Sequence, residues 1–477
     1  MELTQLSVVL LPLCAWYCLA PMRLLQMVFI ASVFGAAAAM VIGGLGLPPG
    51  LPPAVVFLAY VLLQFALGAR YPGEREVWRL GEPLVIAVLY ALMSSVILPR
   101  AFAGQFDVWP QKIDAAFAFP IMLGPTRSNY TQDLYLISNA AVTVLGALFL
   151  TRSGIDFRKL VHTYWAGAIL VAVICLWQFA SRTVGLFYPE AFFYSNPGWV
   201  IFQGQEFGST PRINGPFSEP ASLAFYLSGV IYSAGWVLVR GHRSRLALVV
   251  LPVAIATLAL STSTTGFVVL GAGGAFLLAY ALTAAPPALS ARILKFGVPF
   301  GILMFVAVLT LASLDTGFAR SMDEIIQQTL SKSQTASYDE RTSLDADCLG
   351  ILWPSLGLGA GWGSVRSSSL VPGLLANLGI PGVLLVIWFA LRLWAGVRRA
   401  RRLTSDPGRL LVIDAMGGSL SGILAAALVS APTISTVDFY LSLAVLLGCV
   451  GRVTYEARDH ALQSQGRTAD SIRGYAT

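Results

Sequence analysis

The stretch "RINGPFSEP" places a cation, Arg212, and a carboxylate, Glu219, seven residues apart and directly ahead of a long apolar segment. A guanidinium group stays charged at neutral pH and binds two phosphate oxygens at once. A carboxylate at the start of a helix either stabilises the positive end of the helix dipole or accepts a proton from a reacting hydroxyl. Both interpretations of Glu219 are open from the sequence.

Two further arginines lie in comparable surroundings. Arg341 stands in "YDERTSLDAD", and Arg366 stands in "GWGSVRSSS" after a glycine-rich stretch. Each arginine alone is better explained as a solvated surface residue. Together, beside Gly/Pro turns or at the entrance to apolar stretches, the three favour a site for a lipid diphosphate. The neighbours expected to contact substrate alongside Arg366 are Asn214, Ser218, Glu340 and Trp362.

Other chemistries lack the residues that they need. The three histidines, His162, His242 and His460, are far apart in the sequence and fall in segments expected to face the cytoplasm. Histidine-dependent metal binding and Ser-His catalysis are therefore not expected beside the arginines. Neither a Walker A sequence nor a Rossmann fingerprint is present, so we expect no cofactor.

The elements that must position these residues are membrane helices. The chain has 477 residues, of which 56% are hydrophobic and 12% are charged, whereas soluble domains carry about 25% charged residues. Repeated apolar windows predict an all-α polytopic membrane protein with about 12–13 transmembrane helices in one integral domain, residues 1–477. The predicted spans lie near 3–20, 23–44, 51–69, 80–98, 131–150, 160–180, 217–239, 246–262, 264–283, 293–314, 370–396, 409–430 and 436–452.

Charge sorts the loops between these spans. Basic residues concentrate in alternate loops, as the positive-inside rule predicts for cytoplasmic segments, and this explains the net charge of +7 without nucleic acid. We therefore expect long outer loops at 99–130, 181–216 and 315–369, and a cytoplasmic tail at 453–477. Loop 181–216 is rich in aromatic residues, which suits either an interfacial belt or a platform for sugar rings. Loop 315–369 is expected to hold an interfacial amphipathic helix, with Phe318, Met322, Ile325, Ile326 and Leu330 on one face.

The order of the motifs resembles a known family. "RINGPFSEP", "LSTSTTGF", "ERTS" before "PSLGLGAGWGS", and "LLANLGIPG" follow one another over roughly residues 200–390. In this order they are similar to the O-antigen ligase and polysaccharide polymerase family. Outer-loop arginines of that family match Arg212 and Arg341.

The resemblance implies an inverting, metal-independent glycosyltransferase at the outer face of the bacterial inner membrane. Its substrate would be an undecaprenyl-diphosphate-linked glycan, and its partners would include the bilayer, a chain-length regulator and a flippase. Ligases of the family carry a histidine where this chain has Arg366, so the resemblance favours a polymerase of O-antigen or exopolysaccharide. A ligase acting on lipid A-core and a glycan-lipid flippase are the alternatives.

Overall fold

The computed structural model describes residues 2–111, 119–199, 201, 206–207, 210–297, 299, 336–431 and 434–474. The predicted interfacial helix over Phe318–Leu330 lies outside the described residues, as does most of the predicted span 293–314. Within the described residues the chain is an all-α polytopic membrane protein, and its strands are two or three residues long.

Eight helices of the described residues are long and apolar enough to cross a membrane. They are α4 (Glu74–Ala101), α5 (Arg127–Leu150), α6 (Phe157–Val184), α8 (Pro220–Val239), α10 (Thr264–Thr283), α15 (Leu370–Leu403), α16 (Pro407–Ser430) and α17 (Val437–Gly474). Shorter apolar helices are α1 (Gln5–Trp16), α3 (Leu51–Ala66) and α9 (Arg245–Leu260). The remaining described helices are α2 (Pro21–Ser32), α7 (Glu190–Phe193), α11 (Pro287–Arg292), the π-helix at Ile293–Gly297, and α14 (Ala336–Gly350).

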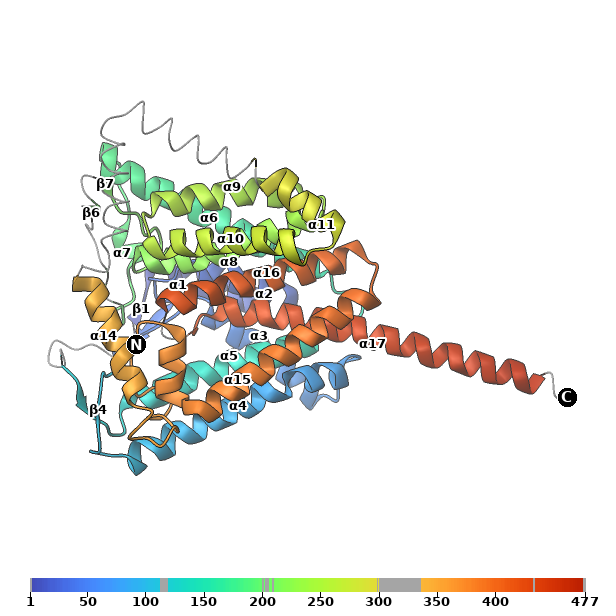
Figure 1. Ribbon diagram of the computed structural model, residues 1–477, viewed down its shortest axis with the longest axis horizontal. Helices are drawn as coiled ribbons and strands as arrows, with labels where there is room; N and C mark the ends of the chain where they lie inside the picture. The colour runs from blue at the N-terminus through green and yellow to red at the C-terminus, as the bar shows by residue number, and fades with distance from the viewer. Residues whose placement is uncertain are drawn as a thin grey trace.

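The segments expected to face outward gather at one end of the bundle. Figure 1 shows α7, α14 and the strand pair β6 (Glu206–Phe207) and β7 (Thr210–Pro211) at this end, together with β4 (Asp107–Val108), which pairs with β5 (Ile121–Met122). We call it the outer end, and we call the opposite end, which carries α11, the inner end. The predicted tail 453–477 continues α17 through Gly474 and projects from the inner end (Figure 1).

The predicted span 23–44 is wrong in its second half. Helix α2 ends at Ser32, and the chain then forms the hairpin of β2 (Met40–Ile42) and β3 (Leu45–Leu47), with β1 (Glu2–Leu3) alongside. Gly43 and Gly44 have φ of 58° and 80°, the left-handed values that a tight two-residue hairpin turn requires. The intervening alanines are apolar, but the backbone N–H of Ala36 donates to Pro216 O at 2.9 Å in the outer loop. Hydropathy alone does not distinguish such a buried extended segment from a helix.

Helices α8 and α16 approach each other backbone to backbone. A Cβ atom added at Gly418 would lie 2.6 Å from Tyr232 O, and one at Gly422 would lie 2.3 Å from Ser228 O. Glycines four residues apart permit this close packing between membrane helices. Beyond the contact of Gly422 with Ser228, each helix runs eight residues further, to Pro220 in α8 and to Ser430 in α16. The antiparallel helices therefore end at the same level of the outer end.

We predict that the outer end faces away from the cytoplasm, because the basic loops lie at the inner end. In a variant without the native cysteines, Trp353→Cys should react with an impermeant maleimide in intact spheroplasts. Arg243→Cys should react only after permeabilisation. Both wild-type side chains are exposed, and Trp353 is 90% exposed, so accessibility within the protein does not limit either reaction. The reverse labelling pattern would contradict this orientation.

Candidate functional site

The turn that carries the "RINGPFSEP" motif is held from within by α6. Oε1 of Gln178 accepts the backbone N–H groups of Asn214 and Gly215 at 3.1 and 2.8 Å, and its amide donates to Asn214 Oδ1 at 2.9 Å. Gln178 and Asn214 are each 1% exposed. Asn214 therefore shapes the turn from inside, and a contact between Asn214 and a substrate stays a prediction.

Gly215 is required at the centre of this turn. Its φ is 55°, and an added Cβ atom would lie 2.5 Å from Cys175 Sγ. The Gly215 carbonyl accepts the hydroxyl groups of Tyr194 at 2.9 Å and Tyr188 at 3.3 Å. Burial raises the pKa of both tyrosines, so their hydroxyls remain protonated donors. The outer-loop tyrosines thus hold the turn together with α6, whose Gln178 also donates to the Tyr194 hydroxyl at 2.7 Å.

Arg212 shares an electrostatic environment with the two other residues predicted to be catalytic. Burial lowers the pKa of the Arg212 guanidinium, Glu219 opposes this effect, and Arg341 adds to it. The guanidinium of Arg182 donates a hydrogen bond to the Arg212 carbonyl. Among the residues that the structure describes, Arg182, Arg341 and Glu219 are therefore neighbours of Arg212 at the outer end.

Glu219 occupies the N-cap position of α8, and Pro220 follows as the first helical residue. Its backbone is extended, and its carbonyl accepts N–H groups of Ser222 and Leu223 at 3.1 and 3.2 Å. Its side chain makes no capping hydrogen bond. The carboxylate thus lies at the positive end of the α8 dipole without being used as a cap. Ser218 is buried, with Oγ 3.5 Å from Ser222 Oγ.

Arg341, which belongs to α14, lies near the level at which α8 begins and α16 ends. Its Nη1 atom donates to Ser430 Oγ at 3.1 Å, at the outer end of α16. Because α16 and α8 end level with each other, this bond brings Arg341 toward the start of α8, where Glu219 lies. The neighbouring Glu340 is exposed on α14. Its contact with a substrate stays a prediction.

Helix α14 also carries the link to Arg366. Asp345 accepts the backbone N–H of Ser369 at 3.2 Å and its hydroxyl at 2.6 Å, which fixes α14 on the first turn of α15. One turn further, Cys348 Sγ donates to the Arg366 carbonyl at 3.3 Å. Arg341 and Cys348 are separated by roughly 10 Å along the helix axis.

The glycine-rich loop before Arg366 inserts at a break in α15. The helix is interrupted at Gly379, whose φ is 63°. The loop N–H of Ala360 donates to Ala376 O at 2.7 Å, and that of Gly361 donates to Asn377 O at 3.0 Å. Backbone groups freed inside a membrane protein need such partners, because lipid provides none. The loop is therefore positioned by its main chain.

Trp362 extends this loop to two other helices. The backbone N–H of Trp362 donates to Ser94 Oγ of α4 at 3.2 Å, and its backbone carbonyl accepts a hydrogen bond from the side-chain amide of Asn129 of α5 at 2.7 Å. The structure therefore divides the predicted site residues into two groups. Arg212 and Glu219 lie beside Arg341, whereas Trp362 and Arg366 lie in the inserted loop, and α14 connects the two groups.

Three residues that support the candidate site can be identified only from the fold. The sequence placed Arg182 on the outer face without a role, and it gave no reason to select Gln178 or Ser430. An arginine in a predicted outer loop was the only available signal for Arg182. The other two act through partners that are distant in the sequence or on another helix, so no local pattern marks them.

The described residues include no group of three histidine, cysteine or acidic side chains that could hold a metal ion. His242 lies at the inner end, where its Nε2 atom is 2.8 Å from Asp414 Oδ2. No protein-family model matches the chain, and no curated protein matches it.

We predict that Gly215→Ala destabilises the protein more than Gly185→Ala does. Both glycines have left-handed φ values, 55° and 74°, so each substitution costs about 1–2 kcal/mol in backbone strain. Only the alanine at 215 would also meet Cys175 Sγ, since nothing lies within 4 Å of a Cβ atom at 185. Thermal unfolding in detergent measures the difference, and equal Tm values for the two variants would contradict it.

Proposed function

We propose that this protein is an inverting, metal-independent glycosyltransferase. It would polymerise undecaprenyl-diphosphate-linked repeat units into O-antigen or exopolysaccharide at the outer face of the bacterial inner membrane. The observation that carries the proposal is that Arg212 has Arg182, Arg341 and Glu219 as neighbours at the outer end of the helix bundle. Arginines that lie together at a membrane surface suit a lipid diphosphate.

The arginines would stabilise the leaving group. In the proposed step the bond between the anomeric carbon and the phosphate oxygen breaks, and the diphosphate leaves with the electron pair. Negative charge then grows on the diphosphate, where positioned guanidinium groups lower the energy of the transition state. Arg341 is already positioned by Ser430, and the backbone that carries Arg212 is fixed by Gln178 and Gly215. This preorganisation avoids rearrangement during the reaction.

Glu219 would accept the proton of the acceptor. A sugar hydroxyl of the second lipid-linked glycan attacks the anomeric carbon from the face opposite the diphosphate, which inverts the configuration. Its proton moves to the Glu219 carboxylate as the new glycosidic bond forms. The absence of a capping hydrogen bond from Glu219 supports this role, because the carboxylate is not engaged by the backbone of α8.

The test supplies the purified protein with lipid-diphosphate repeat units and no lipid A-core. We expect a ladder of longer lipid-linked products. Arg212→Lys should slow the reaction about 10²–10³-fold, because an ammonium lacks the planar fork of guanidinium. The matched control is Arg127→Lys, at an exposed arginine of the same end. Products that form only with lipid A-core would identify a ligase and overturn the proposal.

We predict a separate effect for Glu219→Gln. The amide keeps the size of the side chain but cannot take the proton, so kcat should fall about 10²–10⁴-fold. The KM for the lipid-linked donor should change little, because the arginines still bind the diphosphate. Glu190→Gln, at an exposed carboxylate of the outer end, is the control. An unchanged kcat in Glu219→Gln would contradict the role as base.

A further inference from the structure

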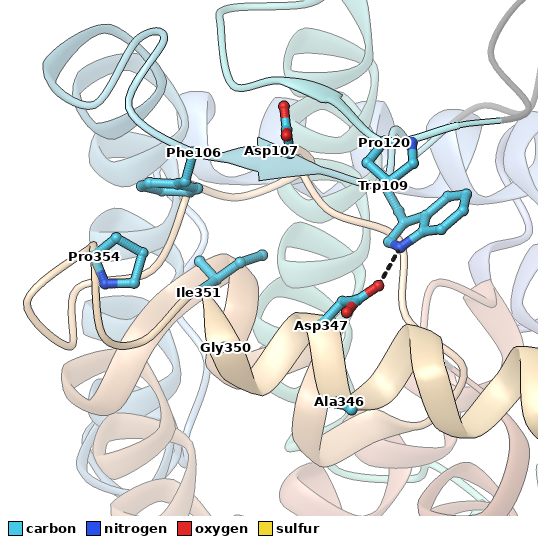
Figure 2. A pocket seen from close by; sticks show the side chains of 9 residues that line it. All are labelled: Phe106, Asp107, Trp109, Pro120, Ala346, Asp347, Gly350, Ile351 and Pro354. Carbon is cyan, nitrogen blue, oxygen red and sulfur yellow. Dashed lines mark hydrogen bonds between the residues drawn. The ribbon is translucent and has the colours of Figure 1, made fainter.

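A recess lies at the outer end, between the strand pair β4–β5 and the C-terminal half of α14. Its volume is about 330 Å³, within the range of small-ligand sites. Figure 2 shows Phe106 above Ile351 and Pro354, which follow α14, and Trp109 at the other side of the cavity, above Asp347. Apolar and aromatic surfaces therefore face each other across the cavity.

Carboxylates supply the polar part of this cavity. The indole Nε1 atom of Trp109 donates to Asp347 Oδ2 at 2.9 Å, so the ring and the carboxylate are held in a fixed relation (Figure 2). Asp347 is exposed and retains a second oxygen that can accept hydrogen bonds. Asp107 lies at the rim and is also exposed. In the part of the chain that the structure describes, which leaves out 112–118, the side chains lining the cavity include no lysine or arginine.

The cavity is joined to the candidate site through the backbone. The Trp109 carbonyl accepts the N–H of Arg366 at 2.9 Å. Asp347 follows Arg341 by six residues of α14, which is about 9 Å along the helix axis. A chain of sugars whose reacting end lies at Arg341 would therefore pass this cavity within a short distance.

We propose that this cavity binds an uncharged sugar of the glycan chain, beyond the residue that reacts. A pyranose ring presents an apolar C–H face, which packs on aromatic side chains, and hydroxyl groups, which donate to carboxylates. An alkyl chain would offer no donor to the second carboxylate oxygen of Asp347, and an acidic sugar would be repelled by both carboxylates. The inference rests on the proposed function for the identity of the ligand as a glycan.

The test measures binding separately from catalysis. The probe is the oligosaccharide released by mild acid from lipid-linked repeat units of cells that carry the gene, titrated calorimetrically into the full-length protein. We expect Asp347→Asn and Phe106→Ala to weaken binding about tenfold each, since each removes one part of the contact. Asp347→Asn keeps an acceptor for the Trp109 indole, so the fold is retained. Trp353→Ala, at a 90% exposed side chain outside the cavity lining, should bind like wild type.

The outcomes separate this inference from the proposed function. Binding to the wild type that both variants weaken, without any polymer from lipid-linked donor, supports the cavity and contradicts the polymerase. Polymer formation with unchanged binding in both variants overturns the cavity as a sugar site. Competition by spermidine at equal strength would identify a cation site and overturn it as well.

Discussion

The close contact between α8 and α16 determines the geometry of the outer end. In lipid, helices gain little from hiding apolar surface from each other, so they associate through tight packing. Gly418 and Gly422 permit the α8 backbone to approach to a distance that a Cβ atom would prevent. The relative height of the two helices then follows, and with it the level at which Arg341 meets the start of α8. The relative position of Arg341 and Glu219 depends on this spacing.

Charged side chains have different partners at the two ends of the bundle. At the inner end, buried Asp414 takes contacts from Arg401 and His242 and lies 3.8 Å from Arg240. A buried carboxylate with these neighbours compensates the positive charge of the side chains packed against it. At the outer end, burial lowers the pKa of Arg212, Arg341 lowers it further, and Glu219 opposes both effects. A bound diphosphate would relieve the repulsion among these cations.

Hydropathy and loop charge were sufficient to predict most of the fold, because the length of an apolar stretch reflects the thickness of the bilayer. They failed after Ser32, where backbone pairing of Ala36 with the outer loop decides the structure. The motif around Arg212 was visible in the sequence as an arginine and a carboxylate beside a turn. Its supports were not, because Gln178 and Ser430 act across helices, and only the packed bundle brings such residues together.

The insertion of the glycine-rich loop at the break in α15 determines which of its residues can be substituted during evolution. Gly361 has a φ of 97°, and an added Cβ atom would lie 2.6 Å from Ser94 O, so this position requires glycine. The loop is nevertheless attached through main-chain groups, the N–H groups of Ala360 and Gly361, and not through side chains. Replacing an outward-facing side chain on this segment therefore leaves its anchorage intact. Side chains on this segment can therefore be exchanged without loss of the scaffold, while Arg366 keeps its place.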